Sequence, residues 1–338
     1  MFTSFGSLGR RKKVRRATHG GRGGWYSDDP KYLAAQLSGW LEAAGSLASN
    51  ASSREDVRAI IGPHAGLSYS GETAAHAYTC LRSSQITRIF LLGPSHHFWT
   101  DRCLLSTADA YATPFGDIEI DKKVYAELEA TGMFGRMDMK VDEAEHSLEL
   151  HLPFISLCMR DRAFTLVPIM VGSCGDEAEV ALGRILAPYL EDPSNFFVVS
   201  SDFCHWGQRF GFTWCDLTMG PIHKSIEWLD RRGMDLISAQ DIRGWKRYLK
   251  EYENTICGRH PISLIMRAID ASASSFAVAF VKYTQSDKCC GPQDESVSYA
   301  SAKVSITGAR PWSAAAGFTC GPVGLARQPP PPPPPSNP

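Results

Sequence analysis

The sequence of 338 residues lacks an excess of charge of either sign. Its 35 Lys and Arg residues stand against 36 Asp and Glu residues, for a formal net charge of −1, so we expect neither nucleic-acid binding nor attraction to an anionic membrane. No apolar run approaches the roughly 18 residues of a membrane span, and residues 1–6 lack the apolar stretch of a secretory signal. We therefore expect a cytoplasmic protein without membrane insertion, and a basic cluster near the N-terminus leaves a nuclear location open.

Zinc-knuckle spacing and Cys-x-x-Cys pairs are also missing from the ten cysteines. In a long chain without a secretory signal, such cysteines are typical of free thiols rather than of disulfides. A chemical role for any one of them must therefore be argued from its neighbours.

Both ends of the chain have the composition of additions to a folded domain. Residues 10–16 read Arg-Arg-Lys-Lys-Val-Arg-Arg, and because like charges repel, residues 1–17 are predicted to be a basic, disordered arm. A nuclear-import or acid-binding role for this cluster is left open. Residues 309–338 are predicted to be a disordered tail, whose seven consecutive prolines would form a polyproline helix able to bind an SH3 or WW domain.

Residues 18–308 alternate between helical and strand patterns. Helices are predicted at residues 29–44, 71–81 and 177–190. Short apolar runs predict strands at residues 59–61, 89–92, 164–171, 195–199, 276–281 and 297–306. Because strands of a parallel sheet are buried on both faces, such runs favour a single α/β domain with a central, largely parallel sheet and helices on both faces.

Three of the predicted strands end in residues that can bind protons or metals. In chain order these are His64, then His96 with His97, then Asp202 with Cys204 and His205. Ligands of open α/β sheets bind beyond the carboxyl ends of the strands, so we expect the three ends to face one cavity. One such histidine alone is more often structural, but their recurrence points to a metal site or an acid/base site.

Cys257 is the cysteine whose neighbours indicate chemistry. It stands in Cys-Gly-Arg-His-Pro, where Pro261 is predicted at the first position of a helix. A thiol just before a helix N-terminus, beside Arg259 and His260, is expected to have a lowered pKa and to form the thiolate that a metal or a redox reaction needs. A buried, inert cysteine is the alternative.

Residues 145–151, Glu-His-Ser-Leu-Glu-Leu-His, leave two interpretations open. His146 and Glu149 would share a face of a helix, whereas the alternating apolar residues 148, 150 and 152 would suit an extended segment. The polar side chains are either groups that orient metal ligands or members of a satisfied structural network.

These segments, in this order, resemble those of the Memo family, the mediators of receptor-driven cell motility. The resemblance covers about residues 18–308 and is close enough to indicate a vertebrate orthologue or isoform. It rests on five motifs: Pro63-His64-Ala65-Gly66 with Tyr69 and Gly71, Leu92-Gly93-Pro94-Ser95-His96-His97, Glu145-His146-Ser147-Leu148-Glu149, Ser200-Ser201-Asp202-Phe203-Cys204-His205-Trp206-Gly207, and Cys257-Gly258-Arg259-His260-Pro261.

The resemblance implies a fold similar to that of class III extradiol dioxygenases, which hold non-haem iron through two histidines and a carboxylate. It implies that His64 and His96 are metal ligands and that Cys257 stands in place of the carboxylate. Such a set suits one copper or iron ion in a redox role. Asp202 and His205 are then the catalytic candidates, and the candidates for orienting the metal ligands or binding a ligand are His97, His146, Glu149, Arg259, His260 and Trp25.

For function, the resemblance implies a redox-metal protein that relays receptor tyrosine kinase signals to the microtubule and actin cytoskeleton in cell migration. Its partner would be a phosphorylated receptor tail or an adaptor of that receptor, with the phosphate bound in a cationic mouth formed by histidines and Arg259. The alternative is a non-haem iron dioxygenase-like oxidoreductase acting on a small substrate, although fold alone is a weak guide to activity. Whether the chain is an enzyme is left open.

One departure from the family's pattern concerns the N-terminal segment. The family's His-Ala-Gly-Ser-Trp-Tyr corresponds here to residues 19–26, which are two residues longer and rich in glycine. We therefore expect no site role for His19.

Overall fold

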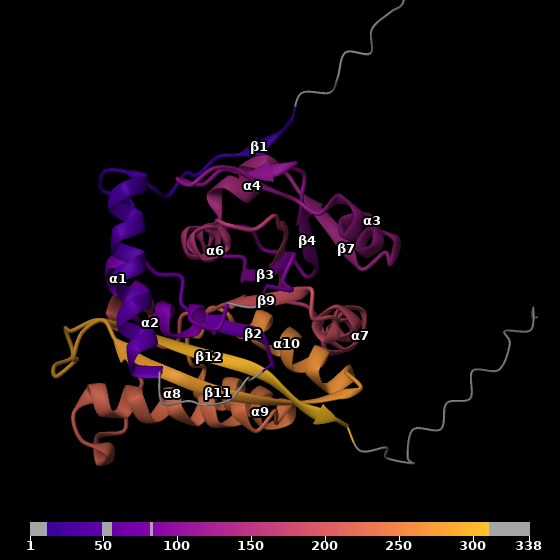
Figure 1. Cartoon of the computed structure of the whole chain (residues 1–338). Coiled ribbons are helices and arrows are strands. Elements are labelled where there is room, and N and C mark those ends of the chain that lie inside the picture. The colour runs from indigo at the N-terminus through magenta and orange to yellow at the C-terminus, as the bar shows by residue number, and fades with distance from the viewer. Residues whose placement is uncertain (1–11, 49–55, 82–83, 311–338) are drawn as a thin grey trace, which may run out of the picture.

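The computed structural model describes residues 12–48, 56–81 and 84–310 (Figure 1). A nine-stranded sheet in the order β10-β12-β2-β9-β3-β8-β4-β7, with β11 beside β12, forms its centre. The four strands in the middle are parallel and almost entirely buried: β2 (Asp56–Gly62), β9 (Asn195–Ser200), β3 (Arg88–Pro94) and β8 (Thr165–Val171). Their apolar runs have no polar face, as burial on both sides of a parallel sheet requires.

The outer strands make the sheet mixed. Both β4 on one side and β12 on the other run antiparallel to the central strands, so the predicted parallel arrangement holds for the middle of the sheet only. The outer strands are β4 (Cys103–Ser106), β7 (Phe134–Met137), β10 (His205–Trp206), β11 (Ser274–Gln285) and β12 (Ser296–Ala309).

Helices cover both faces of this sheet, as predicted (Figure 1). The chain moves one way along the strand order from β2 through α2 to β3, and the opposite way from β8 through α7 to β9. Because parallel crossovers are right-handed, α2 and α7 must lie on opposite faces. The helices are α1 (Pro30–Ala48), α2 (Leu67–Tyr78), α3 (Lys122–Ala130), α4 (Met139–Ala144), α5 (His146–Glu149), α6 (Leu152–Met159), α7 (Asp176–Glu191), α8 (Ile222–Ser238), α9 (Ile242–Tyr252) and α10 (Arg259–Ala271), with 3₁₀ turns at Gln208–Phe210 and Leu217–Met219.

The strand and helix predictions agree with these elements, with shifted ends. The helix expected at residues 71–81 begins earlier, at Leu67, and the one expected at 29–44 runs on to Ala48. Together they form one α/β domain. Within the described residues, no helix combines the length and the apolar character that crossing a membrane requires.

The described part of the basic arm corrects the prediction made for it. Residues 14–15 form strand β1 (Val14–Arg15), which pairs with β5 (Ala110–Tyr111), and β5 pairs in turn with β6 (Ile118–Glu119). Arg15 is fully buried, with its guanidinium 3.2 Å from the Asp142 carboxylate and 2.5 Å from that of Glu149. The folded domain therefore begins before residue 18. The rest of the arm and the polyproline tail lie outside the described residues.

Replacing Arg15 with Met is expected to destabilise the fold strongly, because two buried carboxylates lose their counter-charge. We expect a loss of about 3–5 kcal/mol in the free energy of unfolding, measured by urea denaturation. The matched control is Arg16→Met, since the Arg16 side chain is 77% exposed where it pairs with Glu143. This change should cost about 1 kcal/mol or less. Equal losses in the two variants would contradict the buried network.

Candidate metal centre

The site is built where three neighbouring parallel strands end at one edge of the sheet. Strand β9 lies between β2 and β3, and the segments that follow these strands carry His64, Asp202 and His96. From these strands the chain continues toward opposite ends of the sheet. Open α/β sheets bind their ligands at such a point. The three predicted strand ends thus face one pocket.

His64 is fixed as a neutral ring with one free nitrogen. Its Nδ1 lies 2.6 Å from the Ser200 hydroxyl, which donates its own hydrogen to the carbonyl of Ser147. Since that hydroxyl can then only accept, Nδ1 carries the proton and Nε2 carries the lone pair. Nε2 lies 3.2 Å from the sulfur of Cys257. Burial lowers the pKa of His64 well below its ordinary value, so the lone pair is available to a cation.

His96 is oriented by Glu145, one of the polar residues for which an orienting role and a structural role were both left open. Glu145 accepts hydrogen bonds from the His96 backbone amide at 2.6 Å and from its Nδ1 at 2.8 Å. Burial acts to raise the pKa of Glu145, but the hydrogen bonds from His96 prevail and lower it to about 2. An ionised carboxylate on Nδ1 leaves Nε2 of His96 free to bind a metal, which is the usual arrangement behind metal-binding histidines.

His146 joins these two rings from the first position of α5. Its ring stacks on that of His96 with the centroids 4.3 Å apart, and it lies 5.4 Å from the ring of His64. Burial and the neighbouring imidazole of His96 lower the pKa of His146 to about 3. The helical interpretation of residues 145–151 is therefore the right one where His146 and Glu149 are concerned.

Glu149 belongs to the structural network that was the other interpretation. Its carboxylate accepts from Arg15, from Tyr26 and from both the backbone amide and Nδ1 of His19. His19, for which no site role was expected, thus stands behind the site, with its ring 5.9 Å from that of His146. Trp25 packs on the same ring at 4.4 Å and lines the pocket.

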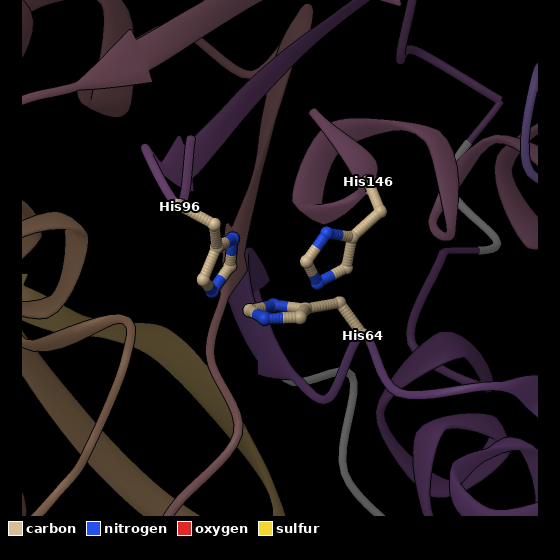
Figure 2. Close-up of side chains that lie close together, drawn as sticks. All are labelled: His64, His96 and His146. Carbon is tan, nitrogen blue, oxygen red and sulfur yellow. The ribbon is translucent and has the colours of Figure 1, made fainter. Parts of the chain in front are cut away.

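Two groups of side chains bring donor atoms within 4.8 Å of one another and could hold a metal ion. One is His64, His96 and His146, and Figure 2 shows these three imidazoles converging from separate segments of the chain. The other is His64, Asp202 and Cys257. His64 belongs to both groups, while the predicted ligands His96 and Cys257 fall in different ones.

Cys257 is brought against His64 and Asp202 because Gly258 packs directly against the end of β9, although Cys257 itself is not among the residues that line the pocket. A Cβ atom at residue 258 would lie 2.2 Å from the Cβ of Ser201, so only glycine allows this approach. The Cys257 sulfur accepts a hydrogen bond from the backbone amide of Asp202 at 3.2 Å. Helix α10 begins at Arg259, two residues before the predicted start at Pro261.

The predicted lowering of the Cys257 pKa is wrong. Desolvation raises the pKa of this thiol well above its ordinary value, and the carboxylate of Asp202 raises it further. Backbone amides and Arg259 act in the opposite direction but do not outweigh burial. The sulfur is therefore a protonated thiol until a cation or a base takes its proton.

The pocket in front of these groups has a volume of about 690 Å³. Asp202 and His205 both line it, as expected, whereas Cys204 and Trp206 are buried in the core. Burial raises the pKa of Asp202 to about 7 and lowers that of His205. The ring nitrogen Nδ1 of His205 faces the carbonyls of Phe203 and Thr255 at 2.9 and 3.0 Å, so it is the protonated one.

Three predicted site residues lie elsewhere. His260 faces Glu179, 3.9 Å away, beside a separate small cavity on the α7 side. Arg259 is absent from the lining of the pocket, and so is His97, which is exposed. Among the described residues, the arginine that lines the pocket is Arg209, which pairs with Glu295. The acidic side chains of Asp287 and Glu295 line the pocket as well, so the predicted cationic mouth of histidines and Arg259 is not formed.

The fold and the pocket define an α/β protein whose candidate metal site lies at the carboxyl ends of its parallel strands. The family model described as "Memo-like protein" matches residues 15–303. The chain belongs to this family, as the resemblance predicted, and the start of the match agrees with the burial of Arg15.

Relatives in several animals share almost half of their residues with the chain. Protein MEMO1 of Xenopus laevis is 46% identical over 87% of this chain and 98% of its own length, and Protein MEMO1 of Homo sapiens is 45% identical over 88% and 100%. Protein memo-1 homolog of Caenorhabditis elegans is 42% identical over 85% and 81%. Among solved structures, an uncharacterized protein of Escherichia coli K12 covers 72% of this chain and 99% of its own at 13% identity, with a TM-score of 0.41.

Replacing Glu145 with Gln is expected to weaken metal binding by about 10–100-fold, because the charged partner that orients His96 is lost. The change keeps the side chain's shape and can be followed by titrating ferrous or cupric ion against a competing chelator. The matched control is Glu143→Gln, whose carboxylate pairs with the exposed Arg16 and should leave the affinity unchanged. Similar affinities for both variants would show that Glu145 has no orienting role.

Proposed function

We propose that the chain holds one copper or iron ion through His64, His96 and Cys257, and that it relays receptor tyrosine kinase signals to the cytoskeleton in migrating cells. The observation that supports metal binding is the pair of imidazoles whose free nitrogens are set by Ser200 and Glu145. The signalling role is supported by membership of the Memo-like family. The proposed location is the cytoplasm, with the nucleus as a further possibility.

The donor atoms fit a transition metal better than a hard cation. The two candidate groups offer imidazole nitrogens, a thiol sulfur and only one carboxylate, whereas magnesium and calcium prefer sets of oxygens. His146 offers a further nitrogen on the His96 side. When bound, copper or iron would supply one-electron redox chemistry.

The chain's own residues control protons around these donors. Asp202 has a pKa of about 7 and lies 4.0 Å from Nε2 of His64, so it can hold or release a proton near neutral pH. The Cys257 thiol must lose its proton to become a ligand, and the Asp202 carboxylate is the nearby base in the same group. His205, neutral through burial, offers a second acceptor on the pocket wall.

We expect the purified chain to carry about one metal ion and to lose it in His64→Ala, His96→Ala and Cys257→Ala, because each change removes a donor. Metal content would be measured on protein prepared under reducing conditions without chelator, with circular dichroism to confirm folding. His146→Ala reports whether the third imidazole contributes. The control is His97→Ala, an exposed ring beside His96 that does not line the pocket. Unchanged metal content in all three variants would end the proposal.

The residues that line the pocket support peptide binding as a second role. Its lining includes the aromatic rings of Trp25 and Tyr69, which are 40% and 66% exposed, together with the guanidinium of Arg209. Exposed aromatic rings and an arginine at one mouth suit a phosphotyrosine side chain. We propose that the partner is a phosphorylated receptor tyrosine kinase tail or an adaptor of that receptor. An SH3 or WW partner of the polyproline tail remains a prediction, because that tail lies outside the described residues.

A phosphotyrosine peptide is expected to bind about tenfold or more tightly than its unphosphorylated form, since a hydrogen bond to a charged group contributes roughly 1.5–3 kcal/mol. Fluorescence titration would measure the two affinities. Arg209→Ala should abolish the difference, while Arg259→Ala, the matched control outside the pocket lining, should preserve it. Equal affinity of the wild-type chain for both peptides would refute recognition in this pocket.

The dioxygenase-like alternative has less support. Sulfur from Cys257 takes the place where the dioxygenases use a carboxylate, and Asp202, the carboxylate nearby, has a pKa raised to about 7 by burial. A carboxylate that is partly protonated at neutral pH is a weaker ligand than an ionised one. The redox-metal proposal accounts for the sulfur directly.

A further inference from the structure

Two cysteines outside the pocket are brought together where β4 and β8 meet. Cys103 is the first residue of β4 and pairs with Val171, the last residue of β8. The two segments stay paired beyond the strands, because the amide of Gly172 donates to the carbonyl of Arg102 at 3.2 Å and the amide of Ser173 donates to that of Thr100 at 2.8 Å. Cys174 follows at once. Backbone pairing thus holds residues 100–105 beside residues 169–173.

A tight turn returns Cys174 toward Cys103. The amide of Cys174 donates to the carbonyl of Gly172 at 2.9 Å, which closes a three-residue turn. A Cβ atom at residue 172 would lie 2.3 Å from the carbonyl oxygen of Thr100 and 2.6 Å from that of Arg102, so only glycine permits this approach. In the resulting position the thiols of Cys103 and Cys174 lie close enough for each to shift the pKa of the other.

We propose that Cys103 and Cys174 form a reversible disulfide when the protein meets hydrogen peroxide. The Cys174 thiolate attacks one peroxide oxygen and becomes a sulfenic acid, with hydroxide leaving. The Cys103 sulfur then attacks the Cys174 sulfur, the S–O bond breaks, and a second hydroxide leaves as the S–S bond forms. The two thiols together lose two electrons and two protons, and one peroxide is reduced to two molecules of water.

The surroundings assign a different part to each thiol. Cys174 is 8% exposed, and its neighbours Ser173 and Gly175 are exposed, so a small oxidant can reach it. The nearby Cys103 thiol lowers the pKa of Cys174, which favours the attacking thiolate. Cys103 is fully buried, and its pKa is raised well above the ordinary value. It therefore suits the second step, in which a sheltered thiol resolves the sulfenic acid.

The cross-link would lie at one end of a segment whose other end is His96, a candidate metal ligand. His96 and Cys103 stand at the two ends of one segment, residues 96–103, which also carries the exposed rings of Phe98 and Trp99. A disulfide to Cys174 would fix the far end of this segment to the start of α7. Oxidation would thus add a covalent link at an end of this segment that backbone hydrogen bonds already hold, with no change at the candidate metal ligands themselves.

The experiment exposes the full chain, kept in a chelator, to hydrogen peroxide, blocks the remaining thiols by alkylation and maps tryptic peptides without reduction. Residues 103–122 and 163–184 are released as peptides with one cysteine each, so their linked form is unambiguous. We expect this linked pair in most chains, its loss after dithiothreitol, and a Tm that is several degrees higher in the oxidised form, because the cross-link restricts the unfolded chain.

Two variants and one condition make the test decisive. Cys174→Ser should give no linked pair and no rise in Tm, whereas Cys290→Ser, which removes an exposed thiol elsewhere, should behave as the wild type. Oxidation of wild-type chain in urea should give mixed pairings instead, which keeps the test valid if a variant folds poorly. The proposal is overturned if native chains keep both cysteines alkylated while Cys257 or Cys290 is oxidised.

Discussion

The placement of β2 and β3 on either side of β9 decides where the candidate site of this protein lies. Strands β2 and β3 lie on the two sides of β9 and run parallel to it, so three loops from distant parts of the chain emerge at one edge. Each loop carries polar side chains, whereas the strand before it is apolar and buried. Helices α5 and α10 then bring His146 and Cys257 against the same edge, because Ser147 bonds to the end of β3 and Gly258 packs on the end of β9.

Burial sets the protonation states of these side chains, and hydrogen bonds fix their orientations. The low dielectric of the interior disfavours imidazolium, so His64 and His146 stay neutral and keep their lone pairs. The same burial keeps Cys257 protonated and Asp202 close to half-ionised at neutral pH. Neutral imidazoles and a thiol of this kind could receive a cation and release protons as ligands form.

Much of the fold and of the site could be predicted from local sequence. The apolar runs before His64 and His96 predicted the two strands, and the position of each histidine after such a run predicted that both lie at one edge of the sheet. Arg15 shows the limit of such reasoning: its neighbours are like charges, but its partners Asp142 and Glu149 stand 127 and 134 residues away. Ser200 was missed as an orienting group for the same reason, and the two roles left open for Glu145 could not be decided, since a hydrogen-bond partner is fixed by three-dimensional packing. The predicted direction of the Cys257 pKa shift was wrong because the desolvation of the thiol depends on the residues that surround the start of the helix.

The position of His64 in both donor groups limits what the pocket can contain. Its ring has a single free nitrogen, because Nδ1 is committed to Ser200. An ion held with His96 and His146 and an ion held with Asp202 and Cys257 would therefore compete for that nitrogen. The two candidate groups, nitrogen-rich on one side and sulfur-containing on the other, could therefore not both use His64 to hold an ion at the same time.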